Sequence, residues 1–467
     1  MTLFNTVIRM SAHGWRAALL TATLGLAAAC GGGRSGPPAG GPSPSGSPRS
    51  SLGPQGYDVV SLFRGLGLLA RGAPLPFVGS VSFFASEFPD STHTLVAVSL
   101  ANTSLTFARE SDRYRAGYSV TIVFRNGPTV VRNIEAHETV VVGSFKETTR
   151  TDESILFEEV ITIPPGRYEF TVSVRDDGSA RTTEDAATLE VPASATVGLS
   201  TPVSFARATL RTRLGSIPQI IVNPTAAAIF GRDSVIPFFL EGYGSSDSTH
   251  GVQYAVRSED GRGLFVDSTT LMRHGAVHSG TINIQASRLG IGAMTLTAWS
   301  PGSPDTVRAP MFVGFGANLP LASYDEMVNY LRWFASPFSI QKLKDTPPEA
   351  RPAAWAEFVD LAAEQHRSTE ALREYFVLMA DANARFREEA SPGWMTDRGR
   401  VLLGLGRPDQ VYEQPARTLS ERGRQQLWEY SRENVVITFF DQSGFGRWRL
   451  TQSSEAEFMT AWRRRVQ

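Results

Sequence analysis

The chain has 467 residues, with 45 lysines and arginines against 46 aspartates and glutamates, and a single cysteine. This length suggests about three domains, and the near-zero net charge argues against a generally basic nucleic-acid-binding protein. One cysteine excludes an intramolecular disulfide framework and a cysteine-rich metal centre. Hydrophobic residues make up 42% of the chain, which is enough for packed cores.

Residues 1–29 have the pattern of an export signal. Arg9 and Arg16 precede an uncharged, mostly apolar run at 17–29, which is too short for a comfortable transmembrane helix. Cys30 follows three alanines, and this ending resembles the signal of bacterial lipoproteins. The resemblance implies that Cys30 is acylated and, because Gly31 follows it, that the protein is sorted to the outer membrane. The alternative is an ordinary secretory signal with an incidental cysteine.

A flexible tether is expected next, at residues 30–56. Glycine, proline and serine dominate this segment, and such a composition cannot bury enough apolar surface to fold. No later run approaches 18 uncharged apolar residues, so the remaining chain is expected to form soluble domains outside the lipid.

Residues 57–197 are predicted to form a β-sandwich-like domain. At 118–124 and 168–174 large apolar residues occupy every second position, which is the period of a half-buried strand. Pro164–Gly166 is expected to make a turn before the second of these strands. Short alternating strands separated by turns are typical of β-sandwiches.

Three further units are expected. Residues 198–318 form a second β-rich, sandwich-like domain, with strands at 235–244 and 294–300. Residues 319–390 form a helical segment, because apolar residues recur there at three- and four-residue spacing; the last helix starts with Ser368 or Thr369 as its cap. Residues 391–467 form a small α+β unit. The expected fold is therefore multidomain, β-rich plus α+β.

Standard catalytic signatures are absent from the sequence, which has no G-x-S-x-G, H-E-x-x-H or P-loop motif. His274 and His278 have the spacing of two metal ligands on a helix, but glycines around them favour a loop or strand. No metal site and no cofactor are therefore expected. Asp397 and Asp409 are the only acidic pair within a dense polar motif.

That motif carries a specific resemblance. Gly393-Trp394-Met395-Thr396-Asp397 matches the sequence that names the GWxTD domain family of bacterial envelope proteins. Further residues fit the family as well: Arg398, Arg400, Gly406, Pro408, Asp409, Trp428 and Tyr430. Weaker similarity lies upstream, for example at Glu241 and Tyr243. The resemblance implies an exported protein or lipoprotein and assigns no reaction, since no catalytic residues are established for the family.

Most of these residues also have a structural interpretation. Gly393 is expected to adopt a backbone conformation that is barred to other residues. Thr396 and Asp397 are suited to cap a helix that starts at Arg398. Gly406 is expected to end this helix in the left-handed region, with Pro408 soon after it.

The remaining motif residues are interpreted as packing and pairing groups. The aromatic residues Trp394, Trp428 and Tyr430 are expected to pack over the small sheet. Arg398 or Arg400 is expected to form a forked ion pair with Asp397 or Asp409. The other interpretation is a polar surface that binds a peptide or glycan.

The sequence favours a noncatalytic, lipid-anchored envelope protein in the outer membrane or periplasm. Its partners would be the membrane, through Cys30, and another envelope protein or a glycan, but not nucleic acid. The alternative is an envelope hydrolase acting on peptide or glycan, with Asp397 and Asp409 as acid and base. A third possibility is a purely structural spacer.

Overall fold

The computed structural model describes residues 59–150, 154–193, 198–315, 322–388, 391–415 and 423–467. The expected signal sequence, Cys30 and the tether at 30–56 lie outside these residues, so the anchor stays a prediction. The described chain forms four β-sheets, a group of helices and a C-terminal α+β unit. The predicted fold class is therefore confirmed.

Two sheets make up the first part of the described chain. One has the strand order β1-β2-β3-β7, and the other has the order β4-β5-β8-β9, with β6 also paired to β5. The elements are α1 (Val59–Gly65), β1 (Leu69–Arg71), β2 (Phe77–Ala85), β3 (Thr92–Ala101), η2 (Asn102–Ser104), β4 (Ala108–Glu110), β5 (Arg113–Asn126), β6 (Thr129–Val142), α2 (Phe145–Thr148), β7 (Ser154–Ile163), β8 (Gly166–Asp176) and β9 (Thr182–Val191).

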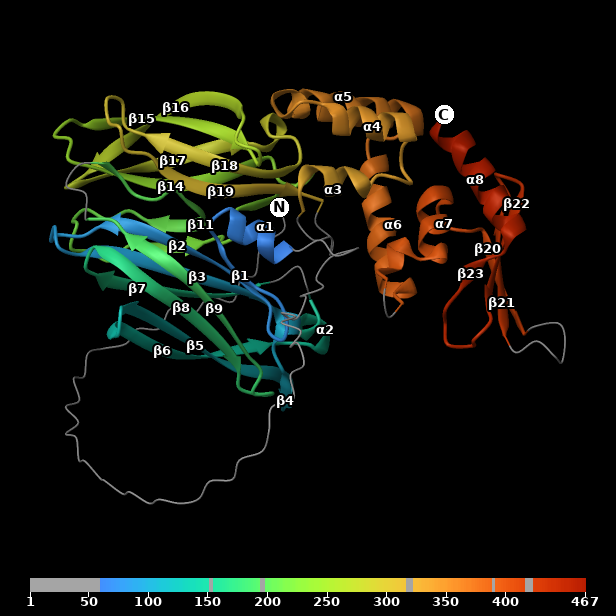
Figure 1. The fold of residues 1–467 in the computed structure, drawn as a ribbon, viewed down its shortest axis with the longest axis horizontal. Coiled ribbons are helices and arrows are strands. Elements are labelled where there is room, and N and C mark those ends of the chain that lie inside the picture. Colours follow the sequence, from blue (N-terminus) through green and yellow to red (C-terminus); the bar gives the residue numbers. More distant parts are fainter. Residues whose placement is uncertain (1–58, 151–153, 194–197, 316–321, 389–390, 416–422) are drawn as a thin grey trace, which may run out of the picture.

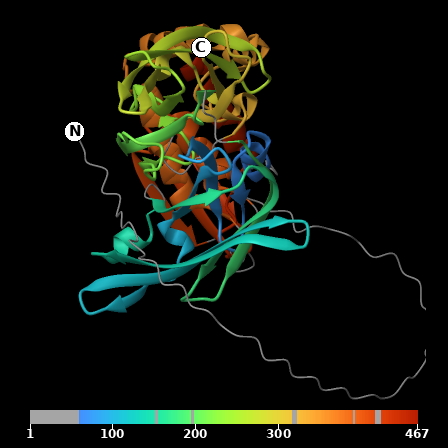
Figure 2. The same cartoon turned by 90° about the vertical axis from the view of Figure 1, so that its left-hand side faces the viewer.

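These two sheets share one hydrophobic core. Every second residue from Tyr118 to Phe124 on β5 is buried, and the same holds from Tyr168 to Val174 on β8. This burial follows the two-residue period of the sequence. Figure 2 shows β5 and β6 as a long hairpin at the end of the molecule opposite the second β part.

A tight corner carries the chain from one sheet to the other. β7 pairs with β3, whereas β8 pairs with β5 and β9, so the turn at Pro164–Gly166 joins strands of different sheets. The Tyr168 hydroxyl donates a hydrogen bond of 2.9 Å to the carbonyl oxygen of Pro164. A tyrosine that bonds back to the upstream backbone holds the same kind of corner in other β-sandwiches.

A ten-stranded sheet forms the second β part, in the order β12-β11-β14-β17-β16-β15-β18-β19-β13, with β10 also paired to β14. The strands are antiparallel except for the pair β13–β19. The elements are β10 (Gly198–Leu199), β11 (Val203–Thr209), β12 (Gln219–Val222), β13 (Ala227–Ile229), β14 (Val235–Tyr243), β15 (Thr249–Ser258), β16 (Gly263–His274), β17 (Val277–Gln285), η3 (Ala286–Arg288), β18 (Gly292–Trp299) and β19 (Val307–Gly314).

The two β parts are joined by a second, smaller core. Phe84 and Leu95 of the first sheet pack against Val203, Val222 and Phe239 of β11, β12 and β14. The first sheet is therefore covered on both faces, and the sheets stack in layers (Figure 1).

Four helices follow the sheets: α3 (Tyr324–Asn329), α4 (Pro337–Asp345), α5 (Arg351–His366) and α6 (Ala371–Phe386), with the short η4 (Pro348–Ala350) before α5. The helix α3 ends at Asn329, and the chain continues from there as turns. Glu370 occupies the N-cap of α6, while the Ser368 hydroxyl accepts a hydrogen bond from the Glu370 N–H at 3.2 Å. The predicted N-cap, Ser368 or Thr369, is therefore wrong by one or two residues.

The C-terminal unit consists of η5 (Gly393–Met395), α7 (Asp397–Leu405), β20 (Gln410–Pro415), β21 (Arg424–Tyr430), β22 (Val435–Asp441), β23 (Arg449–Leu450) and α8 (Gln452–Val466). Its strands form an antiparallel sheet in chain order. Figure 1 shows the helices α3–α6 between the stacked sheets and this unit. Within the described residues, no helix is long and apolar enough to cross a membrane.

A single hydrophobic core runs from the second β part into the C-terminal unit. Phe315, directly after β19, stacks on Phe376 of α6 with ring centroids 3.9 Å apart. The same core includes Leu296 of β18 and Phe439 of β22. Because close-packed interiors deform little, these elements hold one another in fixed positions.

Candidate functional site

The GWxTD motif begins with a close approach of backbones. A Cβ atom at Gly393 would overlap the carbonyl group of Ala382 in α6, and one at Gly399 would overlap the carbonyl group of Gly393. Gly393 does not have a positive φ, so its expected unusual conformation is wrong. Both glycines are needed because α6, η5 and α7 lie in direct backbone contact.

Thr396 fixes the start of α7. Its hydroxyl accepts a hydrogen bond from the Gly399 N–H at 3.2 Å and donates one to the Gly393 carbonyl oxygen at 2.7 Å. The helix begins at Asp397, one residue earlier than predicted. The Asp397 carboxylate instead accepts the Leu450 N–H at 2.8 Å, which ties α7 to β23.

The two motif arginines have different surroundings. Arg400 lies 3.1 Å from Asp397 and also forms a forked pair with Glu455 of α8. The Arg398 guanidinium lies over the rings of Phe386 and Trp448, 4.6 and 5.1 Å from their centroids. Among the described residues, none forms an ion pair with Arg398. Burial lowers the pKa of Arg398 to about 10.

The end of the helix is built around Gly406, Asp409 and Tyr430. Gly406 ends α7 with φ +85°, which favours glycine, but with ψ −164° it lies outside the left-handed helical region. Its carbonyl oxygen accepts a hydrogen bond of 3.2 Å from the Tyr430 hydroxyl. Asp409 accepts the Ser431 N–H at 2.7 Å and pairs with neither Arg398 nor Arg400.

The aromatic motif residues pack on two sides. Trp428 of β21 lies against Phe439 of the same sheet, with ring centroids 4.8 Å apart. Trp394 lies instead against Tyr330, with ring centroids 5.6 Å apart and nearly perpendicular rings, and beneath Arg332. The expectation that Trp394 covers the small sheet is therefore wrong, because η5 turns it toward the helices.

A cavity of about 460 Å³ opens beside the motif, and sequence reasoning missed it. Three arginines line it: Arg385 at the end of α6, Arg398 in α7 and Arg407 after α7. Pro408 also lines it, as do Phe386, Leu402, Val411, Gln426 and Trp428. Neither Asp397 nor Asp409 is among the lining residues. Of the lining residues, only Arg398, Pro408 and Trp428 were indicated by the sequence, because they belong to the motif. No local pattern distinguishes Arg385 or Arg407 from other surface arginines.

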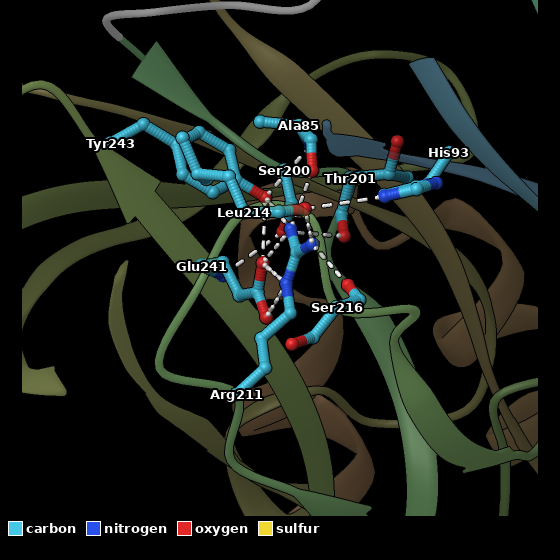
Figure 3. Close-up of polar contacts among 9 residues, drawn as sticks. All are labelled: Ala85, His93, Ser200, Thr201, Arg211, Leu214, Ser216, Glu241 and Tyr243. Carbon is cyan, nitrogen blue, oxygen red and sulfur yellow. Dashed lines mark hydrogen bonds and ion pairs between the residues drawn. The ribbon is translucent and has the colours of Figure 1, made fainter. Parts of the chain in front are cut away.

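A second polar cluster lies buried between the two β parts (Figure 3). The Arg211 guanidinium forms a forked pair with Glu241 of β14 and donates a hydrogen bond of 2.8 Å to the carbonyl oxygen of Ala85 in β2. The Tyr243 hydroxyl donates to Glu241 at 2.8 Å and accepts from the Ala85 N–H at 3.1 Å. Burial and the Glu241 charge raise the pKa of Tyr243 well above its ordinary value.

His93 of β3 extends this cluster. Its Nε2 atom lies 3.2 Å from the carbonyl oxygen of Leu214. Burial and the charge of Arg211 lower the pKa of His93, which favours the neutral form of the ring. The cluster has its polar groups bonded to one another and to backbone, which is the pattern of a structural joint.

The histidines considered as metal ligands lie in a hairpin. His274 ends β16, and His278 in β17 is buried with its Nε2 atom 2.8 Å from the carbonyl oxygen of Asp247. Within the part of the chain that the structure describes, no group of three or more histidine, cysteine, aspartate or glutamate residues could hold a metal ion.

Comparison with known proteins identifies the C-terminal part. The family model of the GWxTD domain matches residues 309–467, a stretch that starts within β19 and includes the helices α3–α6, the motif and the small sheet. No curated protein matches the chain. Residues 309–467 therefore match the GWxTD domain, which confirms the resemblance that the motif indicated.

Proposed function

We propose that this chain is a noncatalytic binding or scaffolding protein of the bacterial envelope. Lipid on Cys30 anchors it, most simply in the outer membrane, and the GWxTD domain binds another envelope component. The observation that carries this proposal is the continuous core from β18 through Phe315 and Phe376 to the small sheet. Such a core supports a domain that presents a binding surface in a fixed position.

The contacts of the motif support a binding role over catalysis. Asp397 holds the Leu450 N–H and Arg400, and Asp409 holds the Ser431 N–H. A hydrolase of the kind considered from the sequence needs two carboxylates that face one open site. These two contact different elements and do not line the cavity, so no observation favours that alternative.

Site-specific photo-crosslinking in intact cells tests the binding role. A photoreactive residue in place of Tyr412, which is 45% exposed on β20, should give a discrete adduct in the membrane fraction. The same residue in place of Val130, equally exposed on β6, is the matched control. Adducts at neither position, or equal adducts at both, would argue against a binding surface on the GWxTD domain.

Fractionation tests the anchor separately. Cys30→Ala should move the protein from the membrane to the soluble fraction, because several acyl chains on one cysteine supply firm anchoring. Retention of Cys30→Ala in the membrane would overturn the lipid anchor and leave the crosslinking result to decide the binding role.

A further inference from the structure

The cavity beside the motif is basic. Arg385, Arg398 and Arg407 line it, and within the described residues no carboxylate does. Asp381 is shared between two of them, at 3.3 Å from Arg385 and 2.9 Å from Arg407. The three guanidinium groups therefore exceed the negative charge that faces them, which favours an anionic ligand.

Two other carboxylates near the cavity form ion pairs with arginines that do not line it. Glu388 forms a forked pair with Arg449, at 2.9 and 3.0 Å. Glu413 of β20 lies 3.4 Å from Arg424. Neither carboxylate pairs with Arg398, which keeps its fork of N–H donors for a ligand.

The environment of Arg398 strengthens an interaction with an anion. The guanidinium is half-buried over two aromatic rings, and burial lowers its pKa. A charge removed from water in this way interacts more strongly with an opposite charge than an exposed one does. Forked arginine–carboxylate pairs add geometric selectivity.

The other walls of the cavity are apolar or carry amide groups. Phe386 and Trp428 provide aromatic surface. The Gln426 side-chain oxygen accepts a hydrogen bond of 3.0 Å from the Trp428 indole N–H, which leaves its amide NH₂ as a donor. A volume of about 460 Å³ exceeds that of one small oxyanion and lies in the range of sites that hold several groups of a ligand.

A free sheet edge borders the cavity. Among the described strands β20 pairs only with β21, so its other edge is not covered by any described strand. Val411 of β20 lines the cavity and is 49% exposed. An extended peptide can add to such an edge through main-chain hydrogen bonds, with alternate side chains placed in pockets.

We propose that this cavity and the edge of β20 bind an extended, acidic segment of another protein. A carboxylate of the segment pairs with Arg398 and its neighbours, an apolar residue next to it contacts Trp428 and Val411, and the backbone pairs with β20. This inference rests on the proposed binding function and goes beyond it by naming the site and the chemistry of the partner.

Fluorescence anisotropy with the purified full-length protein tests the inference. The probe is a fluorescein-labelled ten-residue peptide in which glutamate alternates with valine, and the control peptide has glutamine in place of glutamate. We expect the glutamine peptide to bind at least about tenfold more weakly, because it lacks charge-assisted hydrogen bonds. The glutamate peptide should also lose affinity as salt is raised.

Matched variants locate the site. Arg398→Gln and Arg407→Gln should each weaken binding of the glutamate peptide about tenfold. Arg407 is 58% exposed, so its replacement is not expected to disturb folding. Arg373→Gln, at the other end of α6 with 74% exposure, should bind like the unchanged protein. Equal affinity of the Arg407→Gln variant and the unchanged protein would overturn the inference.

Two further outcomes also decide it. Equal binding of the glutamate and glutamine peptides would show that the charge is not recognised, and displacement of the peptide by millimolar inorganic phosphate would show a general oxyanion site. Either result contradicts the inference. If the Tyr412 position still crosslinks a partner in cells, the proposed binding function survives and only the chemistry of the partner is wrong.

Discussion

The guanidinium of Arg211 and the carboxylate of Glu241 form a forked ion pair, with Nε 2.9 Å from both carboxylate oxygens and Nη2 2.7 Å from Oε2. The two side chains are only 3% and 1% exposed. Because Arg211 also bonds to the Ala85 carbonyl oxygen, this pair connects the first sheet to the second β part. The polar groups that make this connection are almost completely buried, so they bond to one another and not to water.

Replacement of one residue of this ion pair should strongly destabilise the folded protein. Arg211→Met leaves the Glu241 charge buried without its counter-charge, and we expect the free energy of unfolding to fall by about 3–5 kcal/mol. Urea denaturation followed by circular dichroism measures the loss. Arg207→Met, at an exposed position of β11, should change the stability by less than about 0.5 kcal/mol.

The double variant Arg211→Met/Glu241→Leu separates pairing from packing. It should recover part of the loss, since an apolar pair replaces a buried charge. A single variant Arg211→Met as stable as the unchanged protein would contradict the structural role of the joint.

Glu158 of β7 gives the stability a pH dependence. Burial raises its pKa to about 7, against the opposing effect of the hydrogen bond from the Val222 N–H. The folded state therefore binds more protons than the unfolded state between about pH 4.5 and 7, and this group lowers the stability as pH rises through that window. Glu158→Gln keeps an acceptor for Val222 and removes the charge.

The Glu158→Gln variant should match the unchanged protein near pH 4.5 and exceed its free energy of unfolding at pH 8 by about 1–2 kcal/mol. Thermal unfolding at both pH values measures this, with Glu169→Gln at an exposed position of β8 as the control. A difference that is the same at both pH values would contradict a raised pKa at Glu158.

The two motif glycines should tolerate no side chain. Gly399→Ala places a methyl group on the Gly393 carbonyl group, and we expect a loss of about 3 kcal/mol or more from the forced separation of η5 and α7. Gly65→Ala, where a Cβ meets nothing within 4 Å, is the control. Chemical denaturation of both variants checks this, and equal stability would show that the backbone contact can relax.

Thr396 should be replaceable only by another residue with a hydroxyl group. Thr396→Ala removes the N-cap of α7 and should cost about 1–2 kcal/mol, whereas Thr396→Ser keeps the hydroxyl and most of the stability. The comparison by urea denaturation isolates the hydrogen bond to Gly399. A serine variant as unstable as the alanine variant would instead assign the effect to packing of the methyl group.

Local sequence patterns were sufficient for much of the fold. The strands around Val120 and Val172 followed from alternation, and the helix around Phe376 followed from its three- and four-residue spacing. These patterns are informative because one side of each element is buried. Apolar residues therefore recur in the sequence with the period of the strand or helix. The cap at Thr396 was predictable for the same local reason.

Long-range relationships were not predictable in this way. Arg211 meets Glu241 thirty positions further along the chain, and Arg385 and Arg398 line one cavity only because α6 and α7 pack at two glycines. The residues that neighbour these arginines in the sequence do not indicate contacts over such distances along the chain. The direction of Trp394 was also missed, since it depends on how the short η5 turns between two helices.

The glycine contacts between α6, η5 and α7 have a mechanical consequence. A displacement of the α7 backbone toward η5 and α6 would be passed on directly, because the backbone atoms there leave no room even for a Cβ atom at Gly393 or Gly399. From α6 it would pass through the stacked rings of Phe376 and Phe315 into the strand β19. The packing around the motif therefore resists compression, so that a movement of α7 toward α6 is passed on to the sheets and is not absorbed locally.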